Sequence, residues 1–255
     1  MLFLTYSDTY LLLLIILLHR HIVMPSNSPI AKRSAVSDTY GGIVTLCEPT
    51  VEARAAAAKA KVDELPRSAF IHPSEDPRVI AGQGTVSLEL ASQIEGELDV
   101  VIIPVGGGGL AGGNCVALRS LWGDRVKIVL AEPELANDAK RSFETGELCF
   151  NASPVSTVAD GLKTNLGPNT FPIIKELADD VITCSEKDIL ACTRLVWERM
   201  KVMIEPSAAT GVAVLLGDEF KRKYDVEKFK RVGIVLCGGN VDLKKVLDKM
   251  QEYGV

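Results

Sequence analysis

Four consecutive glycines, Gly106 to Gly109, are the sequence feature with the clearest chemistry. They follow a β-branched run at 100–105 and precede an apolar stretch at 110–121. Because glycine has no Cβ, the backbone N–H groups of such a turn can converge on an anion, and the N-terminus of the following helix adds partial positive charge. Plain tight turns also use glycine, but four in succession cost considerable conformational entropy. We therefore expect a phosphate-binding turn here.

The kind of phosphate ligand is not fixed by this turn alone. Gly107, Gly109 and Gly112 fit the pattern G-x-G-x-x-G, and Glu132 falls at the end of the next expected strand. Both features are typical of dinucleotide-binding domains, in which the acidic residue binds a ribose. That fingerprint normally occupies the first strand of its domain, whereas two strand–helix units precede it here. The spacing therefore leaves open the alternative that the protein is an NAD-dependent dehydrogenase.

A second glycine turn narrows the choice of ligand. Cys237, Gly238 and Gly239 again follow an apolar run and precede a helical stretch, and the pair Asp160-Gly161 lies between the two turns in the sequence. Two such turns with a third small-residue turn between them suggest a flat ligand that is held from several strand ends.

These turns have to be positioned by alternating strands and helices. We expect strands at 42–47, 69–72, 100–105, 126–131, 181–184 and 232–236. We expect helices at 51–65, 85–94, 110–121, 137–145, 185–200, 207–220 and 241–253. Ser185 and Ser207 are the expected N-caps of their helices. Regular alternation of this kind predicts an α/β fold with a doubly wound parallel sheet.

Composition restricts the classes of partner. The 255 residues carry a net charge of −5, with 47% apolar and 24% charged residues. An acidic chain without a long basic run gives no reason to expect a nucleic acid or an anionic membrane as partner. The six cysteines are scattered and most lie in apolar runs, which indicates a reducing, cytoplasmic compartment without a disulfide framework. His72, the single histidine beyond residue 21, is expected to be structural.

The first 21 residues do not fit the rest of the pattern. Residues 11–18 are an unbroken apolar run, which is short for a membrane-spanning helix and lacks the flanks of a signal peptide. We leave 1–21 unassigned, so that targeting to a membrane or an organelle stays open.

Six motifs in order resemble the serine racemase and threonine dehydratase family of fold-type II pyridoxal-phosphate enzymes. They lie at 81–85, 105–110, 131–133, 159–161, 204–206 and 237–242. The resemblance runs from about residue 22 to the C-terminus. It implies a partial small domain at 22–72, a large cofactor-binding domain at 73–255, and a small amino-acid substrate of the serine or threonine class.

The resemblance also implies roles for particular residues. Gly106, Gly107, Gly108, Gly109 and Leu110 resemble the cup that binds the phosphate of pyridoxal 5′-phosphate. Gly161 resembles the backbone position beside the cofactor ring, and Cys237 stands where the family keeps a serine or cysteine against the pyridine nitrogen. A neutral thiol there leaves that nitrogen unprotonated, so the ring is a weaker electron sink, which suits racemisation and β-elimination. Ser74 replaces a usual asparagine near the cofactor.

A cation site is implied as well. Glu132, Asp138 and the carbonyl of Ala136 resemble the divalent-cation ligands of the family. Carboxylate and carbonyl oxygens suit Mg²⁺, Ca²⁺ or Mn²⁺, with waters completing the shell. Without the resemblance, two acidic residues at this spacing would be read as solvated surface. Glu205 is expected at the pocket.

Two family segments have no counterpart in the 255 residues. One is the Ser-Phe-Lys-x-Arg-Gly-Ala type segment with the cofactor-binding lysine, and the other is a Ser-Ser-Gly-Asn-His type loop. Lys163 and Lys201 match neither, so no catalytic residue is assigned. We expect an N-terminally truncated member that is inactive as this chain. A non-catalytic binding or dimer-modulating protein is an alternative, and the resemblance allows a homodimer.

Overall fold

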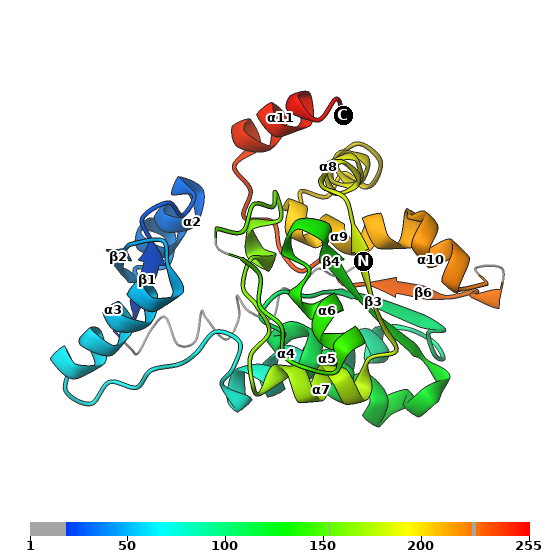
Figure 1. Cartoon of the computed structure of the whole chain (residues 1–255), viewed down its shortest axis with the longest axis horizontal. Helices are drawn as coiled ribbons and strands as arrows, with labels where there is room; N and C mark the ends of the chain where they lie inside the picture. Colours follow the sequence, from blue (N-terminus) through cyan, green and yellow to red (C-terminus); the bar gives the residue numbers. More distant parts are fainter. Residues whose placement is uncertain (1–18, 153, 226–227) are drawn as a thin grey trace. The chain divides into compact units, whose positions relative to one another are not determined.

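The computed structural model describes residues 19–152, 154–225 and 228–255. The chain divides into two compact units (Figure 1). The first comprises Met1–Ile71 with Asn240–Asp242, and the second comprises His72–Gly239 with Leu243–Val255. None of the helices in the described ranges combines the length and the apolarity that a membrane crossing requires. The apolar run at 11–18 lies outside the described residues.

The first unit is built on two parallel strands. β1 (His21–Pro25) pairs with β2 (Ile43–Cys47). Between them lie α2 (Ile30–Ser34) and a π-helical turn, Ala35–Thr39. α3 (Val51–Glu64) follows, and the Thr50 side chain caps it by accepting a hydrogen bond from the Ala53 N–H at 3.1 Å. The expected strand at 42–47 and helix at 51–65 are therefore confirmed.

The prediction of a strand at 69–72 is wrong. This segment has no regular structure, and Phe70 and Ile71 are more than half exposed. A turn follows at once, because His72 Nδ1 accepts the N–H groups of Ser74 and Glu75 at 3.2 and 3.0 Å. A short apolar run beside a proline can look like a strand in the sequence, but this segment pairs with no strand in the structure.

The second unit contains a four-stranded, all-parallel sheet. In the order β5-β4-β3-β6, its strands are Asp180–Cys184, Lys127–Pro133, Val100–Pro104 and Val232–Ile234. Ile102 of β3 is aligned with Val129 of β4 and with Ile234 of β6. Every residue of β3 is buried, as expected for a β-branched run without polar alternation.

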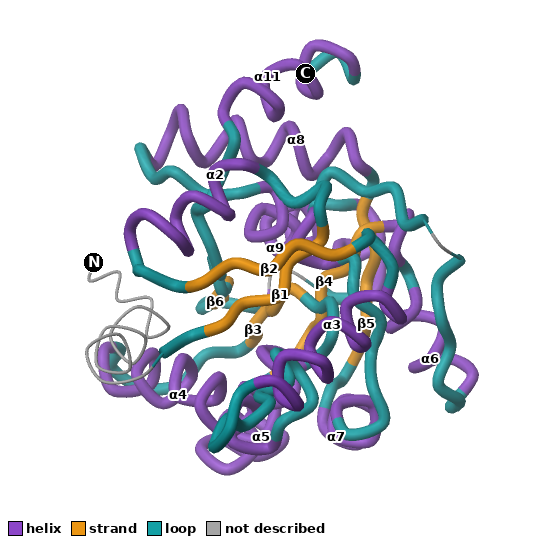
Figure 2. Tube along the Cα trace, turned by 90° about the vertical axis from the view of Figure 1, so that its left-hand side faces the viewer, coloured by secondary structure: helices purple, strands orange, loops and turns teal. Residues whose placement is uncertain are grey.

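Helices cover both faces of this sheet, and Figure 2 shows α4, α5 and α7 on one side and α8 and α9 on the other. The helices are α4 (Pro77–Gln93), α5 (Gly109–Trp122), α6 (Asp138–Thr145), α7 (Thr170–Leu177), α8 (Glu186–Leu195), α9 (Pro206–Leu216), α10 (Asp218–Lys223) and α11 (Leu243–Glu252). Short 3-10 turns lie at Gly123–Arg125, Glu134–Ala136 and Asp160–Leu162. The predicted doubly wound α/β fold is confirmed.

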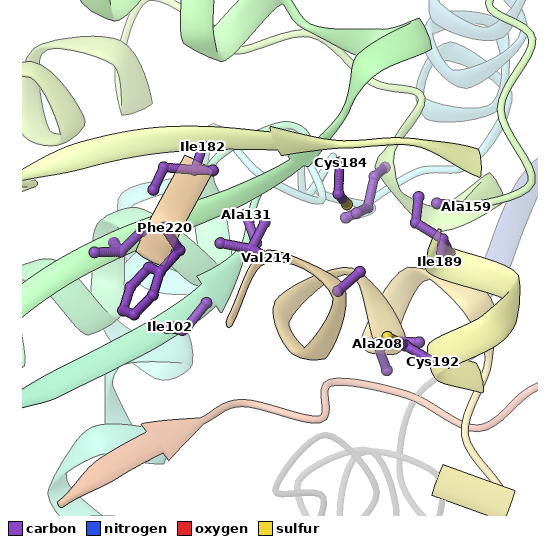
Figure 3. Packing of buried hydrophobic residues seen from close by; sticks show 14 of the residues in the cluster. Ile102, Ala131, Ala159, Ile182, Cys184, Ile189, Cys192, Ala208, Val214 and Phe220 are labelled. Atoms are coloured by element: carbon purple, nitrogen blue, oxygen red, sulfur yellow. The ribbon is translucent and has the colours of Figure 1, made fainter. Parts of the chain in front are cut away.

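Alternate residues of β3 supply two separate cores. Val100 and Ile102 face a cluster that includes residues of α8 and α9 and the ring of Phe220 (Figure 3). Val101 and Ile103 face the other cluster, to which α5 contributes most of its apolar side chains. Because the pleat directs successive side chains to opposite faces, one strand ties both layers together.

Several helices differ from the sequence expectation. α4 begins at Pro77 rather than at residue 85, because Asp76 caps it and proline suits its first turn, and α7 has no counterpart among the expected helices. Ser185 caps α8 by accepting the Asp188 N–H, as predicted, but the last expected turn is a π-helical segment, Val196–Met200. The helix expected at 207–220 begins at Pro206 with Glu205 at the N-cap, and it breaks at Gly217. Ser207 is therefore not an N-cap. Proline is favourable at the first position of a helix, because the N–H that it lacks would have no partner within the helix there. The helix therefore starts at Pro206 rather than after Ser207.

α4 and α5 approach each other through glycines. A Cβ built on Gly113 would lie 2.1 Å from the Ile80 carbonyl oxygen and 2.6 Å from the Gly84 nitrogen, both backbone atoms of α4. By contrast, a Cβ on Gly82, also within α4, would meet nothing within 4 Å.

These two glycines give a matched pair of substitutions. Gly113→Ala should lower the free energy of unfolding by about 2–3 kcal/mol, because two helix backbones would have to separate. Gly82→Ala should raise it by about 0.5–1 kcal/mol through the helix propensity of alanine. Urea unfolding followed by circular dichroism measures both. Equal effects of the two substitutions would contradict the close approach of α4 and α5.

Candidate functional site

The glycine turn lies at the point where the sheet topology reverses. From β3 the chain continues through α5 to β4 on one side, whereas β6 pairs with the other side of β3. In open α/β sheets, ligands bind at the carboxyl ends of strands at such a switch point. The turns after β3 and after β6, which contain Gly106–Gly109 and Cys237–Gly239, are the two turns that the sequence singles out.

The glycine loop presents unused backbone donors. Gly108 has φ of +85° and is the N-cap of α5. Within the described ranges, none of the N–H groups of Gly106 to Gly109 donates to a backbone or side-chain acceptor. Leu110, in the first turn of α5, packs its side chain against the core cluster of Val101 and Ile103. A run of free N–H groups at a helix N-terminus is a site for an anion.

Close packing on the other sides of the loop explains why it needs glycine. A Cβ on Gly107 would lie 2.7 Å from Ser74 Oγ, and one on Gly108 would lie 2.7 Å from Thr170 Cβ. A Cβ on Gly106 would lie 3.0 Å from the Cα atom of Leu162. Three segments distant in sequence therefore hold this loop, and side chains would push them away.

Glu205 joins the turn that contains Gly161 to the turn after β6. Its N–H donates to the Gly238 carbonyl at 3.0 Å. A Cβ on Gly161 would lie 3.2 Å from Glu205 Oε1, and a Cβ on Gly238 would lie 3.0 Å from Glu205 Cδ. Ser207 completes the link, because its Oγ accepts the Gly161 N–H at 3.0 Å. Cys237 is half-buried between the two core clusters.

Glu132 and Asp138 form a buried carboxylate pair. Each is 1% exposed. The two oxygens of Glu132 accept the N–H groups of Ala139 and Lys140 at 2.8 and 2.9 Å. Asp138 accepts the Asn151 amide at 2.6 Å and the Leu166 N–H at 2.8 Å. A ribose ligand would need an accessible carboxylate, so the burial of Glu132 does not favour the dinucleotide interpretation.

Burial makes this pair costly to ionise. It raises the pKa of Glu132 to about 8, and the charge of Asp138 adds to that effect. Burial likewise raises the pKa of Asp138 to about 6. Ala136, the third residue of the predicted cation site, is fully buried in the short turn between them. Within the described ranges, no group of three or more His, Cys, Asp or Glu residues is arranged to hold a metal.

The two lysines that lie near family motifs in the sequence are not buried beside the glycine turns. Lys163 and Lys201 are both exposed. Lys201 has φ of +60° and donates from Nζ to the Glu198 carbonyl, which is a structural contact at the end of the π-helical segment.

The structure adds two residues that sequence reasoning missed, Glu75 and Thr170. The Thr170 hydroxyl donates to the Gly107 carbonyl at 2.9 Å and lies 3.0 Å from Glu75 Oε1. Thr170 is 63 residues from Gly107 and 95 from Glu75, and the residue types along the chain carry no signal for such a contact.

The chain is similar to known proteins along most of its length. A sequence model described as "Pyridoxal-phosphate dependent enzyme" matches residues 18–238. Serine racemase from Dictyostelium discoideum is 46% identical over 227 residues, covering 89% of this chain and 68% of that protein. Serine racemase from Homo sapiens is 43% identical over 223 residues, covering 88% and 64%. The chain thus spans about two thirds of the length of these curated relatives.

A solved structure of threonine deaminase isoform 2 from Solanum lycopersicum, in its processed form, is similar in fold. It superposes with a TM-score of 0.79 at 30% sequence identity, covering 92% of this chain and 66% of that one. The family match extends from β1 through the turn after β6, and so includes the glycine loop, the carboxylate pair and Cys237. The chain belongs to the family of pyridoxal-phosphate dependent enzymes.

Proposed function

We propose that the second unit binds pyridoxal 5′-phosphate at the carboxyl ends of β3 and β6. The observation that carries this proposal is the set of backbone N–H groups at Gly106 to Gly109, which meet no acceptor in the described ranges and lie at the N-terminus of α5. Such a loop suits a phosphate monoester in charge, and it has no side chains to obstruct the approach of one.

The other site residues have defined roles in this proposal. The N–H of Leu110 would join the glycine donors around the phosphate. Gly161, whose N–H donates to Ser207, would lie beside the ring. The Cys237 thiol would face the pyridine nitrogen as a neutral group. When bound, the cofactor supplies an electron-withdrawing ring for reactions at the α-carbon of amino acids.

We propose an amino acid of the serine or threonine class as the substrate, with racemisation or loss of ammonia as the reaction. Relatives named serine racemase and threonine deaminase support this choice. We further propose residues 22–72 as part of the small domain and 73–255 as the large domain, in a cytoplasmic protein that forms a homodimer of the family type.

The 255-residue chain is proposed not to turn over by itself. Removal of an α-proton requires a base that reaches the α-carbon, and covalent activation requires an amine. Neither exposed lysine is an evident candidate for this role, and the family's lysine segment does not occur in the sequence.

Binding of the cofactor is tested first. Wild type should bind pyridoxal 5′-phosphate in equilibrium dialysis, and Gly108→Val should weaken that binding by at least about tenfold, because the new side chain would collide with Thr170 and Leu166. Gly123→Val is the matched control. Gly123 ends the same helix and also has positive φ, but a Cβ there meets nothing within 4 Å. Equal affinity in wild type and Gly108→Val would show that the phosphate binds elsewhere.

Turnover is tested separately. Borohydride reduction of the purified chain with pyridoxal 5′-phosphate, followed by peptide mapping, should yield no stoichiometric pyridoxyl-lysine, and L-serine should yield neither pyruvate nor D-serine. A single labelled lysine together with turnover would overturn this part of the proposal, and Lys163 and Lys201 would be examined first.

We also propose that Glu132, Asp138 and the Ala136 carbonyl hold Mg²⁺, Ca²⁺ or Mn²⁺. Burial makes both carboxylates costly to ionise, and the charge of Asp138 adds to the cost for Glu132. A divalent cation would compensate both charges. All three ligands are hard oxygen atoms, as these cations require.

The metal should stabilise the protein in a pH-dependent way. Both folded-state pKa values lie above the ordinary ones, so the stability that these groups contribute is complete at low pH. It is lost as pH rises from 3.8 to about 6 for Asp138 and from 4.5 to about 8 for Glu132. Mg²⁺ should therefore raise the Tm at pH 8 and have little effect at pH 5, where protons occupy the site. Differential scanning calorimetry measures both shifts.

Two variants complete the metal experiment. Glu132→Gln should remove most of the Mg²⁺-induced shift at pH 8. Glu186→Gln alters another buried carboxylate, which accepts from Thr157 and Val158, and should keep the full shift. The same shift in both variants would exclude Glu132 as a ligand.

A further inference from the structure

The contact between Thr170 and the glycine loop has a geometric consequence. Thr170 is fully buried at the first position of α7, and its Oγ donates to the Gly107 carbonyl at 2.9 Å. The carbonyl of Gly107 and the N–H of Gly108 belong to one planar trans peptide, so they point in opposite directions. Holding the carbonyl against Thr170 therefore directs the Gly108 N–H to the opposite side of the loop.

The loop needs such a fixed point because it has little stiffness of its own. Gly108 has φ of +85°, and glycine has many alternative conformations of similar energy. A peptide that rotated would present its carbonyl oxygen, rather than its N–H, to an anion. Thr170 also accepts the Gly167 N–H at 3.1 Å, so its hydroxyl is anchored on the side of α7 as well.

Glu75 competes for the same proton. The Thr170 hydroxyl has one proton and three acceptors nearby, namely Gly107 O at 2.9 Å, Glu75 Oε1 at 3.0 Å and Gly167 O at 3.4 Å. An ionised carboxylate is the stronger acceptor, because hydrogen bonds to charged groups exceed those to neutral ones. The Glu75 side chain is itself held in place, since Oε2 accepts the Asn169 N–H at 2.8 Å.

We propose that Thr170 is a positioning residue that orients the Gly107–Gly108 peptide toward the phosphate of the ligand, and that Glu75 weakens this orientation by sharing the Thr170 proton. This inference rests on the proposed function, because it concerns the same phosphate cradle. The ligand class is a phosphate monoester, and pyridoxal 5′-phosphate and inorganic phosphate are the probes.

The proposal assigns opposite effects to substitutions at the two residues. Thr170→Val keeps the shape but removes the hydroxyl, and should weaken pyridoxal 5′-phosphate binding by about tenfold. Thr170→Ser keeps the hydroxyl and should stay within about twofold of wild type. Glu75→Gln should tighten binding by about twofold to fivefold, because an amide N–H can donate to Thr170 Oγ and leave the hydroxyl proton to Gly107.

The experiment combines affinity with a local spectroscopic signal. Dissociation constants come from equilibrium dialysis of the full chain, and the Gly108 amide resonance of ¹⁵N-glycine-labelled protein is followed during titration with inorganic phosphate. That resonance should shift in wild type, Thr170→Ser and Glu75→Gln, and should shift much less in Thr170→Val. Thr193→Val is the control for loss of a buried hydroxyl, because Thr193 is equally buried and donates to Ile189 O within α8.

The outcomes separate this inference from the function on which it rests. Absence of pyridoxal 5′-phosphate binding in wild type would overturn the proposed function and the inference with it. Binding by wild type that is equally tight in Thr170→Val would overturn the inference alone, as would an equal loss in Thr193→Val. Should Thr170→Val not fold, the comparison of Thr170→Ser with Glu75→Gln decides, and unchanged or weaker binding by Glu75→Gln overturns the role given to Glu75.

Discussion

The glycine loop has to satisfy two demands that oppose each other. Its backbone N–H groups must keep clear of protein acceptors if they are to bind an anion, yet buried backbone donors without partners are costly. The structure meets both demands by packing the loop tightly on its other sides, with Ser74, Leu162 and Thr170 so close that an added Cβ would have to displace them. The loop is then held by these contacts and by the hydrogen bond from Thr170 to the Gly107 carbonyl, while its N–H groups have no protein acceptor within the described ranges.

The rest of the second unit supports this arrangement. β3 is buried along its whole length and holds the start of the loop between two cores, so the position of Gly106 is fixed from both faces of the sheet. α5 carries the other end of the loop, and its closest neighbour α4 lies against the backbone of Gly113. A displacement of α5 would therefore disturb the N-terminal donors and the helix contact at once. The stability of the unit and the proposed anion binding therefore depend on the same helix.

Much of this could be predicted from the sequence because it is local. Four glycines after a β-branched run predict the turn, and the Ser185 cap predicts the start of α8, since both signals lie within a few residues. Other predictions from the sequence were wrong. The strand expected at 69–72 lacked a partner, and Pro206 displaced Ser207 at the start of α9. The contact of Thr170 with Gly107 could not be predicted, because only the tertiary fold brings these residues together.

Two acidic sites in the second unit, one partly buried and one fully buried, compensate charge differently. Burial alone would raise the pKa of Asp179, but hydrogen bonds from Lys127, the Ile128 N–H and Arg119 hold it below its ordinary value. Glu132 and Asp138 receive only backbone and amide donors within the described ranges, and both pKa values are raised. A buried charge without a counter-charge is strongly unfavourable. The first site carries its cations on hydrogen-bonded side chains, whereas at the second the neutral donors and the charge of Arg141 only partly offset the cost of burial.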